Sequence, residues 1–319
     1  MTPEKMKIAM LSVHSCPVGM LGARDTGGMS VYIRELAREM GRLGHTVDVF
    51  TRVHDPNDPV IIGLGDNARL IHLMAGGIEQ INKLDIYPHL PSFTEELDEF
   101  RRQDGGQYDL IYSNYWLSGL AGQHLAGLWN VPHLVIFHTL GAMKNAAGIG
   151  PGEPELRLEQ EGVLARECSR IIAPTEREKE NLVRFCSAAE ERIAVVPCGI
   201  NLERFQPVDR TEARRRLGIG EGKVVLFVGR FDPLKGIDRL FEAAALLKKS
   251  QPVDLLLVGG DGGKTLNASE ERRRRWAWPG IYALQGRSGR TSFRLITARL
   301  TFAPSLLTMK VSGWLPWNP

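Results

Sequence analysis

The sequence predicts an α/β protein of the doubly wound type, in which parallel strands alternate with helices. Short apolar runs recur along the chain, and each ends in a polar or glycine-bearing loop. The segments between several of these runs have the spacing of amphipathic helices. The same alternation starts again after residue 205, so we expect the 319 residues to contain two sheets.

The first unit of this pattern lies at the N-terminus. An apolar run at 7–14 is followed by a loop that ends in Gly27 and Gly28, a helical stretch at 31–45 and a second apolar run at 47–51. One face of the helical stretch is apolar, with Val31, Leu36, Met40 and Leu43. We expect strand, glycine turn, helix and strand.

The paired glycines have two interpretations. At a strand-to-helix turn, glycine lets backbone N–H groups approach an anion that also feels the positive end of the helix, so a phosphate is the natural ligand. Alternatively, the turn needs a positive φ and glycine serves geometry alone. Both interpretations place Gly27 and Gly28 at the start of the helix.

Further strands are expected at 69–76, 108–116, 133–141, 170–175 and 192–199, with helices at 120–129 and 177–186. Ligands of such sheets gather beyond the carboxyl ends of the strands. The residues at those ends are His14, Asn114, Tyr115, His138, Thr139, Thr175 and Gly199.

A second strand, turn and helix follow the connection at 205–222. The strand is expected at 224–230, the helix at 237–250 and the next strand at 254–262. Arg230 and Lys235 flank the turn, where two cations could reach a diphosphate.

The composition, with 43% hydrophobic and 24% charged residues, is that of an ordinary globular protein. The four cysteines are scattered and form no C-x-x-C pair, and we assign them no histidine partners, so neither a disulfide framework nor a zinc site is expected. A reducing cytoplasm fits this pattern. No apolar run approaches the ~20 residues of a membrane span, so at most peripheral membrane contact is expected.

The C-terminal segment has a different composition. Residues 272–319 contain eight Arg, one Lys and no acidic residue, and they hold four of the six tryptophans. Without them, acidic residues outnumber basic ones. A basic tail that binds nucleic acid is one interpretation of this change.

Several motifs together resemble a known family. The stretches TGGMSVYIREL, NYWLSG, FHTLGAMKN, VVPCGIN and VGRFDPLKG occur in this order. Their combination resembles the retaining glycosyltransferases of family four (group 1), which have two Rossmann-like domains in the B-type fold. The inositol-phosphate branch is the nearest group, and sucrose synthases are more distant. The resemblance covers about residues 7 to 263.

The resemblance implies roles for particular residues. Gly27 and Gly28 would let the backbone approach the donor phosphate and sugar, and Arg230 and Lys235 would neutralise the leaving nucleoside diphosphate. His138 would face the reacting sugar as the catalytic-site residue. The phosphate of the acceptor would be held by Lys83, Tyr115, Thr139 and Arg157.

Structural interpretations of these residues remain open. His138 can be a strand-end histidine bonded to the backbone, and Tyr115 can be a core or interface residue. Lys83 and Arg157 alone are typical of solvated surface charges. No D-x-D motif occurs, so neither a metal at the leaving group nor any other cofactor is expected.

The family's Glu-x7-Glu motif does not follow the strand at 254–262. The codons can be regrouped so that each new codon takes the last base of one residue's codon and the first two bases of the next residue's codon. In this frame Met309-Lys310 and Trp317-Asn318 must each give glutamate, and the two glutamates are eight positions apart. We therefore expect that the reading frame of the family was lost between about Gly263 and Trp276.

These observations predict three parts. Residues 1–205 form a complete Rossmann-like acceptor-side domain, 206–263 start a nucleotide-sugar domain, and 264–319 are an out-of-frame, disordered basic tail. The expected function is transfer of a hexosyl or N-acetylhexosaminyl group from a nucleotide-diphosphate sugar to a small phosphorylated or sugar acceptor, impaired in this form. A non-catalytic acceptor-binding remnant and a nucleic-acid-binding tail are the alternatives, although no nucleic-acid partner is expected. A homodimer is possible.

Overall fold

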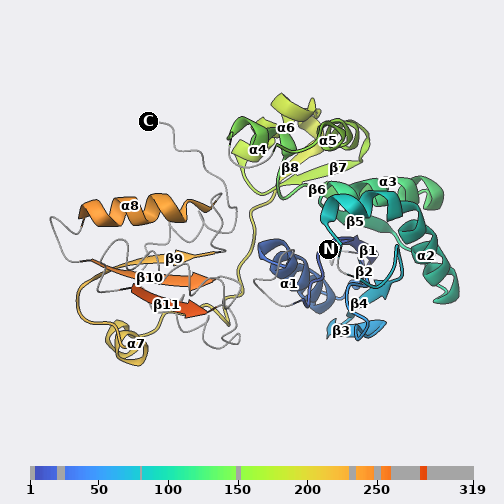
Figure 1. Ribbon diagram of the computed structural model, residues 1–319. Helices are drawn as coiled ribbons and strands as arrows, with labels where there is room; N and C mark the ends of the chain where they lie inside the picture. The colour runs from blue at the N-terminus through green and yellow to red at the C-terminus, as the bar shows by residue number, and fades with distance from the viewer. Residues whose placement is uncertain are drawn as a thin grey trace. The chain divides into compact units, whose positions relative to one another are not determined.

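The computed structural model describes residues 4–19, 26–79, 81–148, 152–229, 235–247, 253–259 and 281–285. The chain divides into two compact units, and each is described by itself (Figure 1). The division falls between Cys198 and Gly199, a little before the predicted boundary at residue 205. Both units combine helices with parallel strands, which confirms the predicted α/β class.

The first unit is built on one eight-stranded sheet of order β3-β4-β2-β1-β5-β6-β7-β8. Every neighbouring pair is parallel except β3 and β4, which are antiparallel at one edge. The strands are β1 (Lys7–Leu11), β2 (Thr46–Arg52), β3 (Ile61–Gly65), β4 (Ala68–Leu73), β5 (Leu110–Asn114), β6 (His133–Ile136), β7 (Arg170–Ala173) and β8 (Ile193–Val195).

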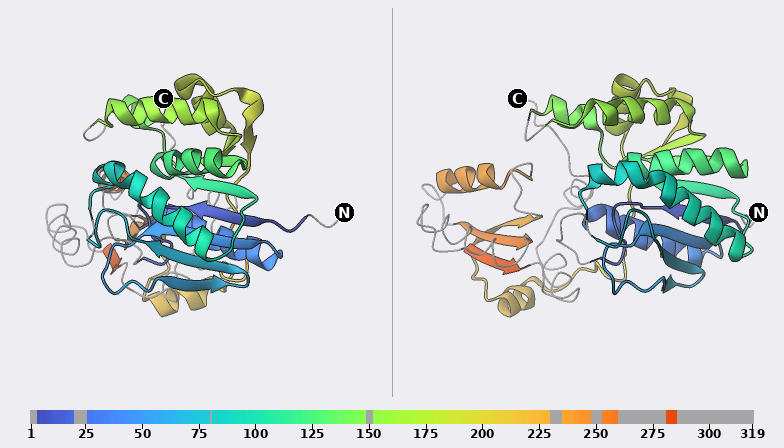
Figure 2. Two further views of the ribbon diagram at one scale, coloured as in Figure 1. Left: turned by 90° about the vertical axis from the view of Figure 1, so that its right-hand side faces the viewer. Right: turned by 45° about the vertical axis from the view of Figure 1, so that its right-hand side comes forward.

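Helices connect these strands (Figure 2). They are α1 (Gly28–Arg42), η1 (Lys83–His89), α2 (Leu90–Gln103), α3 (Trp116–Trp129), α4 (Gly141–Ala146), α5 (Glu155–Glu167), α6 (Glu176–Cys186) and η2 (Glu190–Arg192). In the part of the chain that the structure describes, no helix has the length and apolar character needed to cross a membrane.

The sheet of the first unit has a core on each face. Along β1, Ile8 and Met10 pack with Ile33 of α1, while Ala9 and Leu11 belong to the other core, together with Phe93 of α2. Successive side chains of a strand point to opposite faces, so an unbroken apolar run fits a strand covered on both sides. The apolar run of β1 therefore requires helices on both faces of the sheet, which is the doubly wound arrangement.

The second unit contains α7 (Arg210–Leu217), β9 (Lys223–Val228), α8 (Ile237–Leu247), β10 (Val253–Gly259) and β11 (Ile281–Gln285). Its three strands are parallel in the order β11-β10-β9, and α8 packs on β9 and β10 through Ile237 and Phe241. The predicted strand, helix and strand at 224–262 are confirmed, although the strands end earlier than expected.

One prediction for the C-terminal segment is wrong. We expected residues 264–319 to be disordered, yet residues 281–285 form β11, which pairs with β10. Ile, Tyr and Leu favour strands, and an exposed row of backbone N–H and C=O groups is a template for such a segment. The rest of the predicted tail, 264–280 and 286–319, lies outside the described residues.

The sequence analysis placed no element at α5 or α7. On α5 the inward face carries the buried charges Arg157 and Glu161, so the helix lacks an apolar stripe. At α7, Asp209 caps the helix by accepting a hydrogen bond from the Glu212 N–H at 2.8 Å. An aspartate before RTEARRRL is a start signal that the sequence does contain.

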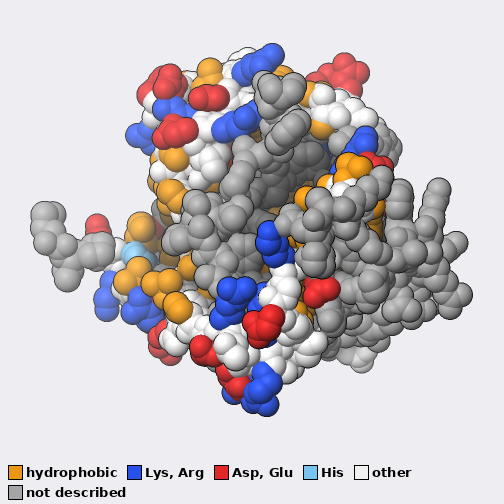
Figure 3. All heavy atoms as spheres, turned by 90° about the vertical axis from the view of Figure 1, so that its left-hand side faces the viewer, with side chains coloured by type: hydrophobic (Ala, Val, Ile, Leu, Met, Phe, Trp, Pro, Cys, Tyr) orange, Lys and Arg blue, Asp and Glu red, His pale blue; other side chains and the backbone are white. Residues whose placement is uncertain are grey.

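Charges of both signs are interspersed on the face of the molecule in Figure 3, among the side chains that are coloured there. On α7, for example, Arg215 and Arg216 both form ion pairs with Glu212. The predicted nucleic-acid alternative depends instead on the basic tail, most of which lies outside the described residues.

The buried His133, at the start of β6, makes the first unit sensitive to acid. The residue is 3% exposed, and burial lowers the pKa of its imidazole from 6.5 to about 4. Because the folded pKa is the lower one, the unfolded state binds more protons between these values, and stability falls as the pH falls through that window. At pH 5 this side chain alone should cost about 2 kcal/mol relative to pH 7.

Urea unfolding at pH 5 and pH 7 measures this effect. His133→Gln should show a shallower loss of stability toward pH 5 than the unchanged chain. His124→Gln, on the exposed surface of α3, is the matched control and should keep the original dependence. Equal pH dependence in the two variants would contradict the assignment.

Candidate functional site

The carboxyl ends of three central strands meet at one edge of the first sheet. β5 pairs with β1 on one side and β6 on the other, all in parallel, so the residues after them lie together. The ring centroids of His14 and Tyr115 are 4.5 Å apart. His138, after β6, has its Nε2 atom 3.0 Å from Asn114 Oδ1. Thr175 lies elsewhere and caps α6.

Tyr115 is the centre of this arrangement. It joins β5 to α3 with φ 78° and ψ 159°, a backbone conformation almost restricted to glycine. Its side chain is 4% exposed, and burial raises the pKa of the phenol to about 12. A non-glycine residue held in such a conformation costs of order 1–3 kcal/mol and is typical of functional sites.

Two cations lie against the Tyr115 ring. The Arg157 Cζ atom is 4.8 Å from the ring centroid, and the Lys83 Nζ atom is 5.9 Å from it. Burial, followed by the charges of Lys83, His138 and Arg157, lowers the pKa of His14 to about 3, so that ring is neutral near pH 7. Two cations near one buried ring make a site that favours an anion.

Arg157 is fully buried and holds the site together. Its Nε donates to Glu161 Oε1 at 2.7 Å, and its Nη2 donates to the Thr139 carbonyl at 2.7 Å and the Thr139 hydroxyl at 3.1 Å. Its Nη1 lies 2.8 Å from Glu153 Oε2. The guanidinium therefore links α5 to the loop after β6. The four acceptor residues expected from the sequence, Lys83, Tyr115, Thr139 and Arg157, thus lie together.

The two carboxylates that pair with Arg157, those of Glu161 and Glu153, have pKa values shifted in opposite directions. Burial raises the pKa of Glu161, although Arg157 and the Gly141 N–H oppose it. Burial would also raise the pKa of Glu153, but a hydrogen bond from Lys144 and the charge of Arg157 prevail and hold it at about 2. The N–H of Gly141 donates to Glu161 Oε2 at 2.8 Å. Both carboxylates thereby fix the start of α4.

Several buried polar atoms at this site have no aligned hydrogen-bond partner. The described residues contain eight such side-chain atoms, and four of them belong to the Tyr115 cluster: His14 Nδ1, the Tyr115 hydroxyl, Trp116 Nε1 and Arg157 Nη1. Arg157 Nη1 is nevertheless paired with the Glu153 carboxylate, which leaves the other three. Because a buried polar atom without a partner costs about 1–3 kcal/mol, these three atoms favour the approach of a polar ligand.

His138 has a defined tautomer. Asn114 Nδ2 donates to the Leu11 carbonyl at 3.3 Å, so its Oδ1 accepts from His138 Nε2–H. Burial lowers the pKa of His138 to about 3, and the ring is neutral with its lone pair on Nδ1. The residue has φ 59°, a second left-handed position at this edge. Its ring packs edge-on against the ring of Tyr32 of α1, with the two ring centroids 5.2 Å apart.

Gly27 and Gly28 begin α1 as predicted, but the geometric explanation for them is wrong. Gly27 has φ −161°, and neither glycine is among the residues with positive φ. A Cβ built on either would meet no described atom within 4 Å. Turn geometry and packing therefore do not require glycine here. The second interpretation, approach of an anion to the first N–H groups of the helix, stays a prediction.

Gly28→Ala separates these explanations. Because Gly28 is the first residue of α1 and its Cβ has room, alanine should raise the free energy of unfolding by up to about 1 kcal/mol. The variant should nevertheless bind a nucleoside-diphosphate sugar less well than the unchanged chain. Urea unfolding and a thermal-shift titration measure the two effects. A loss of stability in the variant would restore the geometric explanation.

The predicted donor cations fall in the second unit. Lys235 is exposed and lies two residues before α8, where Gly236 has φ 70°. Here the turn does need the left-handed conformation that glycine adopts readily. Arg230 lies outside the described residues. The structure thus groups the acceptor residues within the first unit.

One expectation about the cysteines is wrong. We expected no histidine partner for Cys16, yet the His72 Nε2 atom is 3.5 Å from Cys16 Sγ. His54 lies beside the same thiol. The three residues come from the loop after β1, the loop after β2 and strand β4, and the sheet order β4-β2-β1 brings them together. The positions of these residues along the sequence do not show that they lie close together.

The sequence analysis also missed Glu153, Glu161 and Asn114 as parts of the site. A signal for the first two exists, because Glu153, Arg157 and Glu161 are spaced by four residues. We interpreted Arg157 without its neighbours. Asn114 was named only as a strand-end residue, and its contact with His138 depends on the pairing of β5 with β6.

Comparison with known proteins gives two family matches. The family described as Glycosyltransferase Family 4 matches residues 26–204, and Glycosyl transferases group 1 matches residues 209–277. The curated D-inositol 3-phosphate glycosyltransferase of Geodermatophilus obscurus is 39% identical over 86% of this chain and 63% of its own length. That of Nocardia farcinica is 40% identical over 82% of this chain and 59% of its own length. The chain thus spans about three fifths of these relatives.

Solved structures give a concordant result. Sucrose-phosphate synthase from Thermosynechococcus elongatus aligns with 92% of this chain and 74% of its own, with 31% identity and a TM-score of 0.82. Anabaena HepE, solved with UDP and glucose, aligns with 92% of this chain and 72% of its own, with 18% identity and a TM-score of 0.64, a likeness of fold. The predicted B-type glycosyltransferase fold is confirmed by these matches.

Proposed function

Because this chain belongs to the family 4 and group 1 glycosyltransferases, we propose that it is built to transfer a sugar from a nucleoside-diphosphate sugar to a small phosphorylated acceptor. The observation that carries the acceptor class is the group of unpaired polar atoms beside Lys83 and Arg157 around the Tyr115 ring. A phosphate accepts several hydrogen bonds and carries the charge that two cations favour.

Two features support an inositol phosphate as the acceptor. The curated relatives are named D-inositol 3-phosphate glycosyltransferases. The polar atoms around Tyr115 include both hydrogen-bond donors and the Nδ1 atom of neutral His14, which suits a ligand that carries hydroxyl groups beside its phosphate.

The transfer step follows from the placement of charge. As the glycosidic bond breaks, the diphosphate gains negative charge. From the family resemblance we propose that the backbone at Gly27 and Gly28 and the cations Arg230 and Lys235 stabilise it. His138, held neutral beside α1, would face the reacting sugar. Because the chain resembles the retaining glycosyltransferases, we propose that the transfer retains the anomeric configuration, with acceptor and leaving group on one face.

We further propose that the transfer is impaired in this chain. The change of composition after Gly263 and the two glutamates recovered by codon regrouping support a lost frame in the donor domain. A non-catalytic acceptor-binding remnant is therefore the second candidate function, and it is favoured by an acceptor cluster made entirely of first-unit residues. We place either function in the cytoplasm, where free thiols such as the four found here stay reduced.

A transfer assay distinguishes these proposals. The chain, and the chain with the frame restored by one base, are each incubated with UDP-, GDP- or ADP-hexoses and D-inositol 3-phosphate, and mass spectrometry detects the glycosylated product. We expect transfer by the frame-restored chain and little by the present one. Binding of the acceptor without transfer in both would favour the remnant, whereas neither binding nor transfer would overturn the proposed function.

A further inference from the structure

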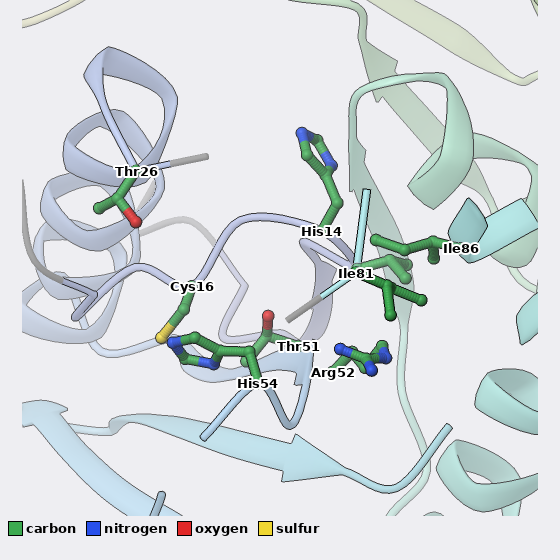
Figure 4. Close-up of a pocket in the computed structure, with 9 residues that line it drawn as sticks. His14, Cys16, Thr26, Thr51, Arg52, His54, Ile81 and Ile86 are labelled. Atoms are coloured by element: carbon green, nitrogen blue, oxygen red, sulfur yellow. The ribbon is translucent and has the colours of Figure 1, made fainter. Parts of the chain in front are cut away.

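A second cluster of reactive side chains lies next to the acceptor site but is not part of it. Cys16, His54 and His72 each offer a ligand atom, and these atoms lie within 4.8 Å of one another. Cys16 and His54 also line a small pocket together with His14, Thr51 and other residues (Figure 4). In that view the Cys16 sulfur lies against the His54 ring.

Each histidine of the cluster is oriented by an oxygen. His72 Nδ1 lies 2.7 Å from the Pro59 carbonyl, which can only accept, so Nδ1 carries the proton and Nε2 turns its lone pair toward Cys16. His54 Nδ1 lies 2.8 Å from Asp58 Oδ2. Imidazoles that ligate metals are typically held in this way, by a carbonyl or carboxylate on the other ring nitrogen.

The Asp58 carboxylate, which orients His54, is itself fixed by hydrogen bonds. Asp58 Oδ2 accepts the backbone N–H groups of His54 at 3.1 Å and Asp55 at 3.0 Å. The neighbouring cation Arg52 is turned to backbone carbonyls, including those of Ala75 at 2.7 Å and Val53 at 2.8 Å. Its guanidinium is therefore directed at these carbonyl oxygens, and the carboxylate of Asp58 lies beside the cluster.

The Cys16 thiol is enclosed beside the two imidazoles, since the residue is only 5% exposed. A tetrahedral zinc ion with Zn–S near 2.3 Å and Zn–N near 2.0 Å spaces its ligand atoms roughly 3.3–3.6 Å apart. The distance of 3.5 Å between Cys16 Sγ and His72 Nε2 already matches that spacing. The other two distances need to shorten by at most about 1.5 Å from their limit of 4.8 Å.

We propose that Cys16, His54 and His72 bind one zinc ion, with the fourth position open to the pocket. Binding would release the thiol proton to solvent and leave both imidazoles neutral. The ion would tie the loop after β1, which also carries His14, to β2 and β4. Its role is therefore structural, in fixing the position of that loop beside the acceptor site, and it is independent of the proposed transfer.

Cobalt(II) titration of the full chain tests this proposal, because a thiolate–cobalt bond gives a charge-transfer band in the near ultraviolet. We expect one equivalent to produce this band together with tetrahedral visible bands, and zinc to displace it. Cys16→Ser should lose the charge-transfer band, whereas Cys186→Ser, which removes a buried cysteine of α6, should keep it. Asp58→Asn should weaken binding by about 10–100-fold.

The unchanged chain decides the question even if a variant does not fold. Absence of the charge-transfer band in the unchanged chain would overturn the proposal. So would a band that persists in folded Cys16→Ser, since the ion would then sit on another cysteine. A zinc-dependent rise of the melting temperature that His72→Gln removes and His124→Gln retains would support the proposal.

Discussion

Replacing Arg157 with methionine is expected to lower the free energy of unfolding by about 3–5 kcal/mol. The guanidinium is fully buried and compensates Glu161, which is 1% exposed, as well as Glu153. Without it, a buried carboxylate must stay charged and unpaired or take up a proton. Urea unfolding at neutral pH measures the loss. The Thr139 carbonyl also loses its donor, so the loop after β6 is destabilised together with α5.

Two further variants identify the cause. Arg166→Met changes an exposed arginine of the same helix and should alter stability by no more than about 0.5 kcal/mol. The double variant Arg157→Met with Glu161→Met removes both charges and should recover much of the loss, because apolar replacement of a whole buried pair is often neutral. No recovery in the double variant would show that packing, and not the unpaired charge, explains the effect.

Lys83→Gln is expected to reduce the affinity for a phosphorylated acceptor about 10- to 150-fold, the equivalent of one charge-assisted hydrogen bond of 1.5–3 kcal/mol. The residue begins η1, is half-buried and places its Nζ atom 5.9 Å from the Tyr115 ring centre. Glutamine keeps most of the stem but removes the charge, so stability should change little. Isothermal titration with D-inositol 3-phosphate measures the affinity.

The matched control is Lys5→Gln, which removes the charge of an exposed lysine before β1. That variant should bind the phosphorylated acceptor as the unchanged chain does. Raising the salt concentration should weaken binding more in the unchanged chain than in Lys83→Gln, since one fewer charge is involved. Equal affinities in Lys83→Gln and Lys5→Gln would remove Lys83 from the site.

Local patterns predicted most of the fold. Apolar runs such as KIAML and the one-sided helix after Gly28 belong to structures whose side chains meet apolar cores, and those elements are confirmed. No local pattern was assigned to β3, α2 or α4. Helix α5 was missed because its inward face is charged, and β11 because its pairing with β10 depends on a distant partner. Helix α7 carried a capping signal that we did not use.

The candidate site was only partly accessible from the sequence. Lys83, Tyr115, Thr139 and Arg157 came from a family resemblance, and the contacts around the Tyr115 ring unite them. Arg157 forms ion pairs with two carboxylates because its side chain is buried, and the sequence alone does not show which side chains are buried. The Cys16, His54 and His72 cluster could not be predicted at all, because three strand connections separate its members.

The central claim is that the Tyr115 cluster binds the phosphate of a small acceptor. Isothermal titration of the unchanged chain with D-inositol 3-phosphate and, separately, with myo-inositol tests it most directly. The account predicts saturable binding of the phosphorylated compound, and binding of myo-inositol that is weaker by at least the 10-fold expected for one lost charge-assisted contact. Equal affinities for the two compounds, or no binding of either, would contradict it.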